Sequence, residues 1–144
     1  MRRTQSSAGL TLIEVLVVIV VLGVLATLVA PNIFQHVGTA KTAAARSQIE
    51  LLVAALDAYR LDNDMYPTEA QGLEALRREP VIEPRPRNWR GPYLRKEVPL
   101  DPWGRPYIYR LTQNGEGFEY ELLSYGRDGV PGGEGEDADV SAWE

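Results

Sequence analysis

One apolar run constrains this chain more than any other feature. From Leu10 to Phe34 the sequence reads LTLIEVLVVIVVLGVLATLVAPNIF, and its only ionisable side chain is Glu14. About 20 consecutive apolar residues span the hydrocarbon core of a bilayer as a helix. Arg2 and Arg3 precede the run, so the positive-inside rule keeps the N-terminus cytoplasmic and places the rest of the chain outside. We therefore predict a single membrane-spanning helix.

A cleaved secretory signal peptide is the alternative interpretation of this run. Such a peptide has a shorter apolar core and an A-x-A-like site after it, and Ala26–Ala30 (ATLVA) offers only a weak site of that kind. Glu14 is unusual, because a carboxylate within an apolar span costs roughly 2.5–3.5 kcal/mol near the bilayer centre and less near an end. It lies at interface depth, or is tolerated by a very apolar span, or pairs with a cation in an assembly.

The remainder of the chain is acidic and has the composition of a folded domain. Only three of the 20 acidic residues lie before Leu61, and the net charge at pH 7 is −5. A nucleic-acid partner is disfavoured, because phosphate contacts need a basic face. The sequence has no cysteine, which excludes disulfides and thiolate metal sites. It has one histidine, His36, and no nucleophile–base set, so an enzyme is the least favoured class of function.

Helical periodicity continues beyond the apolar run. Apolar residues recur at helical spacing along one face: Ile49, Leu52, Leu56 and Tyr59. We predict one long helix from Leu10 to about Leu61, whose second half lays this stripe against a globular head. Pro31 predicts a kink or break near Ala30, because proline removes a backbone hydrogen bond and clashes with the preceding turn.

Beyond the long helix, the sequence predicts a short helix and then an irregular stretch. Thr68 and Gln71 fit a capping box, Thr-x-x-Gln, that opens a helix of about Glu69–Arg77. Pro80–Pro92 is proline-rich, and we expect it to be an irregular loop.

A small sheet is predicted after this loop. Asp101–Pro106 (DPWGRP) is expected to form tight turns that lead into a strand. Strands at Tyr107–Leu111 and Phe118–Ser124 would flank Asn114-Gly115 as a hairpin. The head is therefore predicted to be α+β, a helix packed on a small antiparallel sheet, and the apolar stripe of the long helix must complete its core.

The C-terminal segment is strongly acidic. From Asp128 to Glu144 it holds six acidic residues, no basic residue and four glycines. One interpretation is a solvated, mobile tail, because like charges this dense repel one another. The other is a hard-cation site, because Ca²⁺ takes six to eight oxygens from carboxylates and backbone carbonyls. The segment is no EF-hand, since Val130 and Gly132 stand where that motif places ligands. Trp143 is expected to pack the segment onto the head, the alternative being an exposed tryptophan.

The start of the apolar run carries a family resemblance. Gly9-Leu10-Thr11-Leu12-Ile13-Glu14 resembles the cleavage motif of type IV pilins and type II secretion pseudopilins. The resemblance implies that a membrane prepilin peptidase cuts after Gly9 and that the new N-terminal amine of Leu10 is methylated. It also implies that Glu14 pairs with the amine of a neighbouring subunit during assembly. Leu10 is a mild departure, because the family more often has phenylalanine there.

Three stretches of the head resemble the major pseudopilins of type II secretion systems. They are YPTEAQGLEAL, GPYLRKEVPLDPWGRPYIY and YGRDGVPGGEGEDADVSAW. The resemblance implies a type IV pilin-like fold, a long N-terminal helix on a small antiparallel sheet with a calcium loop. It further implies a bound Ca²⁺ with these ligands: the side chains of Asp128, Asp137 and Asp139, and the backbone carbonyls of Tyr125 and Val130. Many type IV pilins carry a C-terminal disulfide, so the absence of cysteine also favours a pseudopilin.

The resemblance also implies an organisation and a function. Residues 1–9 are a prepilin leader peptide, residues 10–34 a transmembrane and assembly helix, and residues 35–144 a periplasmic head that includes the amphipathic half of the long helix. The processed chain waits in inner-membrane lipid and then forms a homopolymer, the pseudopilus, that drives folded proteins across the outer membrane. Its implied partners are minor pseudopilins and the inner-membrane assembly platform. The alternatives are a type IV pilin of a surface filament and a membrane-anchored calcium-binding periplasmic module that never polymerises.

Overall fold

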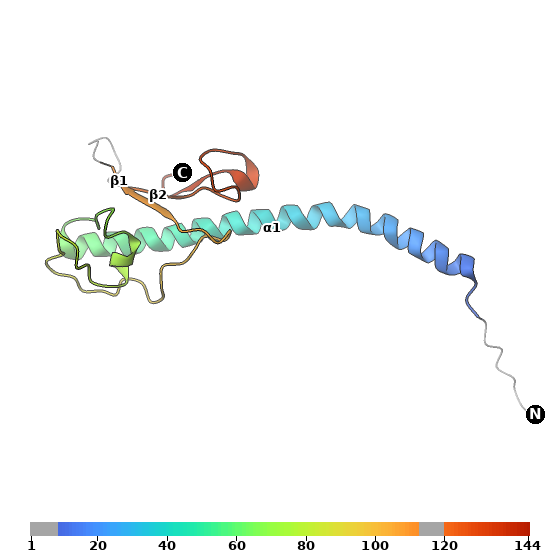
Figure 1. Cartoon of the computed structure of the whole chain (residues 1–144), viewed down its shortest axis with the longest axis horizontal. Coiled ribbons are helices and arrows are strands. Elements are labelled where there is room, and N and C mark those ends of the chain that lie inside the picture. The colour runs from blue at the N-terminus through green and yellow to red at the C-terminus, as the bar shows by residue number, and fades with distance from the viewer. Residues whose placement is uncertain (1–8, 113–119) are drawn as a thin grey trace, which may run out of the picture. The chain divides into compact units, whose positions relative to one another are not determined.

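The computed structural model describes residues 9–112 and 120–144 of the chain. Its elements, in chain order, are helix α1 (Leu12–Asn63), the 3₁₀-helix η1 (Leu73–Leu76), strands β1 (Ile108–Leu111) and β2 (Tyr120–Ser124), the 3₁₀-helix η2 (Gly135–Asp137) and strand β3 (Val140–Ser141) (Figure 1). Tertiary contacts divide the chain into an N-terminal unit that ends at Val37 and a head unit, Gly38–Glu144. The predicted α+β architecture, with a long N-terminal helix and a small antiparallel sheet, is confirmed.

Helix α1 begins and ends within two residues of the predicted bounds. Its end has a local cause, because Asp64 adopts a left-handed conformation with φ 60° while its N–H still donates to the Arg60 carbonyl at 2.7 Å. A kink or break was predicted near Ala30, and the break does not occur, because α1 is continuous through Pro31. A proline removes only one backbone hydrogen bond from the ladder, and the bonds on either side carry the helix past it.

The core of the head forms where α1 meets the sheet. All four residues of the predicted stripe are buried: Ile49, Leu52, Leu56 and Tyr59. They pack in one cluster with side chains from η1 and all three strands or their flanks, among them Leu76, Tyr107, Tyr120, Leu122 and Val140. Because these partners lie far apart in sequence, the amphipathic half of α1 closes a core that the sheet cannot build alone.

The sheet is antiparallel, with strand order β1-β2-β3. Ile108 of β1 lies opposite Leu123, and Leu111 lies opposite Tyr120. On the other side of β2, Ser124 lies opposite Val140 of β3, a strand of two residues that the sequence did not predict. The predicted turn at Asn114-Gly115 and the predicted strand start at Phe118 lie outside the described residues. Strand β3 returns the end of the acidic segment to the sheet.

The predicted helix at Glu69–Arg77 is shorter than expected. The capping box is present, because the Thr68 N–H donates to Gln71 Oε1 at 3.0 Å and the Gln71 N–H donates to Thr68 Oγ1 at 3.2 Å. The chain then turns at Gly72, which has φ 59° and stops a continuous α-helix, so that only the 3₁₀-helix η1 follows. The stretch from Pro80 to Pro92 has no helix or strand, as predicted.

Candidate functional site

The predicted cleavage site lies just before α1. Gly9 and Leu10 are exposed, and neither belongs to a helix or strand. The Leu10 side chain is 78% exposed, and a Cβ added at Gly9 would meet no atom of the described chain within 4 Å. No described residue therefore blocks access of a peptidase to the Gly9–Leu10 peptide bond.

Glu14 lies in the first turn of α1 and bonds back to the residue before the helix. Its Oε2 accepts hydrogen bonds from the Thr11 backbone N–H at 3.3 Å and from Thr11 Oγ1 at 3.4 Å. A carboxylate here also faces the positive end of the helix dipole. This capping role was not predicted, although Thr11-Leu12-Ile13-Glu14 fits the Thr-x-x-Glu pattern that signals it.

The first half of α1 presents apolar side chains to its surroundings. The window Leu12–Val29 has a mean hydropathy of 3.0, and none of it is buried against the rest of the described chain. By length and composition this helix can cross a membrane. An apolar surface of this extent marks a membrane or protein contact.

We define the acidic loop as Tyr125–Asp139. Two of the predicted calcium ligands, Asp128 and Asp139, bond to backbone groups in its Val130–Gly132 segment. Asp128 Oδ1 accepts a hydrogen bond from the Val130 N–H at 3.1 Å, and Asp139 Oδ2 accepts one from the Gly132 N–H at 3.0 Å. Asp139 Oδ1 is buried and has no hydrogen-bond partner among the described residues. A buried carboxylate oxygen without a partner is costly, so this oxygen is available to a cation.

The third predicted side-chain ligand, Asp137, is bound to an arginine. Arg127 Nε and Nη2 donate to the two carboxylate oxygens of Asp137, both at 2.8 Å, and Arg127 Nη1 donates to Glu136 Oε2 at 3.1 Å. The bonded guanidinium lowers the pKa of Asp137 below its usual range. This ion pair was not predicted, although Arg127 is the only basic residue after Arg110 in the sequence.

Asp128 and Asp139 thus bond backbone groups two residues apart, whereas Asp137 is held by Arg127. Within the described ranges, no three side chains of His, Cys, Asp or Glu lie close enough together to hold a metal ion. In these hydrogen bonds the carboxylates of Asp128 and Asp139 each accept one backbone N–H, so both can still donate oxygen lone pairs to a cation. A hard cation bound here would need backbone carbonyls to complete its oxygen shell.

Glycines let the backbone of the acidic loop pack on itself. Gly126 has φ 67°, and a Cβ there would lie 2.7 Å from the Ala138 carbonyl oxygen. Gly38 of α1 makes a second close approach, because a Cβ there would clash with the Glu136 side chain. The absence of side chains at these two positions therefore lets the loop close and lets Glu136 rest on α1 within the head unit.

Trp143 packs after the loop as predicted. Its indole Nε1 donates to the Tyr120 carbonyl at 2.9 Å, and its ring lies 5.2 Å from that of Tyr120. The ring remains 39% exposed. The segment after the loop is therefore tied to the central strand of the sheet and is not a free tail.

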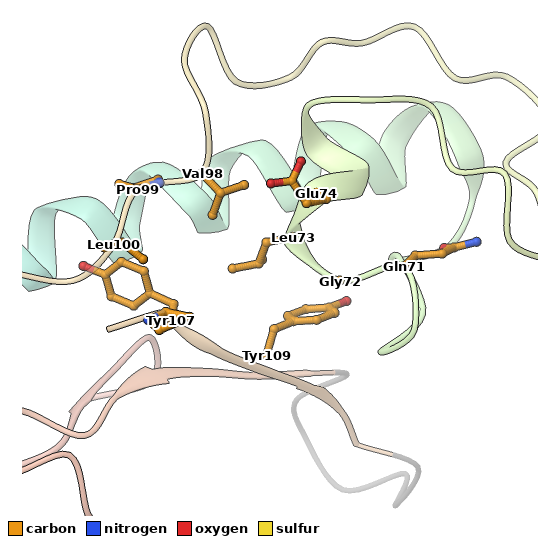
Figure 2. Close-up of a pocket in the computed structure, with 10 residues that line it drawn as sticks. Gln71, Gly72, Leu73, Glu74, Val98, Pro99, Leu100, Tyr107 and Tyr109 are labelled. Atoms are coloured by element: carbon orange, nitrogen blue, oxygen red, sulfur yellow. The ribbon is translucent and has the colours of Figure 1, made fainter. Parts of the chain in front are cut away.

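A cavity of about 360 Å³ in the head lies between the approach to η1, the segment Val98–Leu100 and strand β1 (Figure 2). Figure 2 shows Leu73, Tyr107 and Tyr109 around it. Burial raises the pKa of both tyrosine phenols, and Asp101 adds to the effect at Tyr107, so both stay neutral. Tyr107 donates to Gln48, and Tyr109 donates to the Pro67 carbonyl at 2.7 Å. These phenols join parts of the head, so their hydroxyls are already engaged by protein groups.

Comparisons with known proteins identify the family. A family model described as "Type II secretion system (T2SS), protein G" matches residues 32–143, and a "Prokaryotic N-terminal methylation motif" matches residues 4–30. The type II secretion system core protein G of Pseudomonas aeruginosa is 46% identical over 144 residues, covering 100% of this chain and 99% of that protein. The protein of the same name from Vibrio cholerae serotype O1 is 44% identical, covering 99% and 96%.

A solved structure agrees with these sequence matches. The crystal structure of the major pseudopilin from the type 2 secretion system of enterohaemorrhagic Escherichia coli aligns with a TM-score of 0.64 at 38% identity, covering 78% of this chain and 95% of that one. The family model covers most of the head, and the two relatives match over nearly their whole length. This chain therefore belongs to the protein G family of type II secretion systems, the major pseudopilins.

Proposed function

We propose that this chain, a structural subunit of the type II secretion pseudopilus and not an enzyme, polymerises through its N-terminal helix. The observation that carries the proposal is the apolar window Leu12–Val29, whose side chains are exposed within the described chain. Inner-membrane lipid covers this surface before assembly, and the packed helices of other copies cover it in the filament. The head lies in the periplasm, because Arg2 and Arg3 hold the N-terminus in the cytoplasm.

Processing precedes assembly in this proposal. A prepilin peptidase cuts after Gly9, and the amine of Leu10 is methylated. The homopolymer works with other components of the secretion system, in particular minor pseudopilins and the inner-membrane assembly platform, and drives folded proteins across the outer membrane. Replacing Gly9 with valine should leave an unprocessed band of lower mobility on a gel, whereas normal cutting of that variant would contradict the cleavage assignment.

In the filament, Glu14 pairs with the amine of a neighbouring copy's Leu10. Its bonds to Thr11, at 3.3 and 3.4 Å, are long for a carboxylate, so the carboxylate can exchange them for a stronger partner. In a low-dielectric surround, attraction between unit charges exceeds its value in water several-fold, although desolvation offsets much of the gain.

Disulfide cross-linking tests polymerisation directly, because the chain has no cysteine of its own. A variant with Val17→Cys and Val24→Cys should form a ladder of multimers under oxidation in cells that carry the secretion system. Adding Glu14→Val should preserve membrane insertion and processing but abolish the ladder. No ladder from the first variant would contradict polymerisation through this helix, and an undiminished ladder from the second would contradict the Glu14 pair. Antibody labelling of intact cells separates a pseudopilus from a surface filament.

We also propose that the acidic loop binds Ca²⁺. The buried, unpartnered Asp139 Oδ1 is the observation that favours it. Asp128 and Asp139 would supply carboxylates, and the carbonyls of Tyr125 and Val130 would supply neutral oxygens, the mixed set that Ca²⁺ takes. Asp137 can join this set only if its carboxylate leaves Arg127. The ion would supply positive charge that offsets repulsion among the loop carboxylates.

Titration calorimetry of the full chain in detergent micelles tests the calcium site. After removal of divalent cations with EDTA, the wild-type chain should bind one Ca²⁺, and Asp128→Ala should abolish the binding. Glu134→Gln is the matched control, because it removes an exposed charge from the same loop without removing a proposed ligand. Absence of binding to the wild-type chain, or equal losses in both variants, would contradict the proposed site.

A further inference from the structure

A buried aspartate, Asp101, bonds the residue that precedes the acidic loop and is not one of the proposed ligands. Asp101 is 5% exposed, and its Oδ1 accepts the backbone N–H groups of Trp103 at 3.1 Å and Arg105 at 2.8 Å. Its second oxygen, Oδ2, accepts the Ser124 hydroxyl at 2.6 Å. Asp101 therefore ties the turn that it opens to the end of strand β2.

Ser124 passes this link to the first peptide unit of the acidic loop. Its Oγ, which donates to Asp101, also accepts the Gly126 N–H at 3.2 Å, and both hydrogen bonds are buried. The Gly126 N–H and the Tyr125 carbonyl belong to the same trans peptide plane and point in opposite directions. A hydrogen bond that fixes this N–H therefore also fixes the direction of the Tyr125 carbonyl, a proposed calcium ligand.

Arg105 engages the next two carbonyls. Its Nη1 donates to the Gly126 carbonyl at 3.0 Å and to the Arg127 carbonyl at 2.9 Å. A Cβ at Gly129 would lie 2.6 Å from the Arg105 guanidinium, so the loop lies directly against this side chain. The carbonyls of Gly126 and Arg127 therefore point towards the Arg105 guanidinium. The Tyr125 carbonyl is not one of the groups that Arg105 bonds in these contacts.

We propose that Asp101, acting through Ser124, is a positioning residue that orients the Tyr125 carbonyl for the cation. Arg105 assists by holding the two following carbonyls away from it. This inference rests on the proposed calcium binding. The physical advantage is preorganisation, because a ligand already held in direction costs less conformational freedom when the ion binds. Partners of this kind behind metal ligands typically change metal affinity by 10- to 100-fold.

Ser124→Ala is the sharpest test, because it removes the link while leaving Asp101 and the turn in place. In the full chain in detergent micelles, the variant should bind Ca²⁺ about tenfold more weakly than the wild-type chain. The NMR resonance of the Tyr125 carbonyl carbon should shift on Ca²⁺ addition in the wild-type chain and shift much less in the variant. Amide exchange at Gly126 should also be faster in the variant without calcium.

Tyr109→Phe is the matched control. It removes one side-chain hydrogen bond, to the Pro67 carbonyl at 2.7 Å, from a strand that holds no proposed ligand. It should lower the melting temperature of the head while leaving the Ca²⁺ affinity within about twofold of the wild-type value, so that a general loss of stability is distinguished from a loss of positioning.

The outcomes separate the two proposals. If the wild-type chain binds Ca²⁺ and Ser124→Ala binds it equally well, the positioning role is overturned while the calcium site stands. If Tyr109→Phe weakens binding as much as Ser124→Ala, general destabilisation explains the effect and the positioning role is again overturned. If the wild-type chain binds no Ca²⁺, the site and the positioning role fail together.

Discussion

At the scale of single residues, Arg127 leaves most of the negative charge of the acidic loop unneutralised, because Tyr125–Asp139 holds five acidic residues and one basic residue. Arg127 satisfies Asp137 and Glu136 with three charge-assisted hydrogen bonds of 2.8–3.1 Å. Asp139 keeps a buried oxygen that no described group bonds. The loop thus holds an internal cation, the Arg127 guanidinium, and an external cation bound at Asp139 would be repelled by it.

Replacing Arg127 with glutamine should therefore strengthen calcium binding. The change removes a positive charge from the loop and frees Asp137, so the dissociation constant for Ca²⁺ should fall about fivefold. Without calcium the same variant should melt earlier, because Glu136 and Asp137 lose their shared partner. Calorimetry and thermal melting of the full chain in micelles measure both effects.

The control for this prediction is Arg110→Gln, which removes an exposed ion pair to Glu121 at 3.5 Å on the sheet. That substitution should leave calcium affinity unchanged. Weaker binding by Arg127→Gln would mean that Arg127 holds the loop in its binding conformation, contrary to the competition argued above.

At the scale of elements, the sequence predicted those helices and strands whose formation depends on neighbouring residues, and missed those that depend on distant partners. The stripe Ile49–Tyr59 repeats with helical spacing, so α1 was predictable without knowledge of its partners. Strand β3 was not, because two residues carry no periodicity and form a strand only by pairing with β2. The length of the helix after Thr68 depended on Gly72, whose φ of 59° no neighbouring residue dictates.

The same distinction applies to the candidate site. Gly9 and Glu14 stand in a contiguous motif, so a single stretch of sequence pointed to them. Asp128 and Asp139 came from the family resemblance, since composition alone left a solvated tail open. The link from Asp101 through Ser124 joins residues 23 positions apart, and no local pattern announces a hydrogen bond of that span.

Gln71 connects two irregular segments of the head, the turn before η1 and the proline-rich stretch Pro80–Pro92. It is 8% exposed, and its Nε2 donates to the carbonyls of Ile82 and Pro84, both at 2.8 Å. Its Oε1 accepts the Thr68 N–H in the capping box. One amide side chain therefore fastens the proline-rich stretch to the turn before η1.

We predict that Gln71→Ala destabilises the head by about 2 kcal/mol, because it leaves partly buried carbonyls without donors. For a unit of about 100 residues this corresponds to a fall of roughly 10 °C in melting temperature. Thermal melting followed by circular dichroism checks it. Thr68→Ala, which removes the capping hydroxyl but leaves the Gln71 side chain in place, should lower the melting temperature less, and a comparable loss in both variants would assign the effect to the capping box alone.

At the scale of the whole molecule, the two units differ in what they bury. The window Leu12–Val29 buries none of its apolar surface within the described chain. The head instead builds its core around tyrosines, with edge-to-face contacts between Tyr66 and Tyr120 at 4.7 Å and between Tyr59 and Tyr93 at 5.5 Å. A core that holds neutral phenols is stable only while they remain protonated.

The head should accordingly lose stability in alkaline solution. Burial raises the pKa of Tyr107, Tyr109 and Tyr120 above that of an exposed tyrosine, near 10. Below about pH 10 the folded and unfolded chains bind the same phenolic protons, so this contribution to stability is fully present. Above it only the unfolded chain ionises, and each phenol removes at most about 1.4 kcal/mol per pH unit.

Urea unfolding at a series of alkaline pH values, with phenolate absorbance recorded alongside, measures this loss. Tyr109→Phe should make the fall shallower, because one phenol no longer titrates. Ionisation of all seven tyrosines near pH 10 without any unfolding would contradict the protected core.

Calcium should stabilise the whole head, and the buried oxygen of Asp139 makes the test specific. A ligand that binds only the folded state adds about 2.7 kcal/mol at a hundredfold excess over its dissociation constant, worth roughly 10–20 °C in melting temperature for a unit of about 100 residues. The full chain in micelles should therefore melt well above its EDTA value in millimolar Ca²⁺, and Mg²⁺ should substitute poorly because it holds its waters.

Asp139→Asn should melt no lower than the wild-type chain in EDTA, because it removes a charge whose Oδ1 has no bonding partner among the described residues. The same variant should gain no stability from calcium. Identical wild-type curves in EDTA and in calcium would mean that the acidic loop holds no ion.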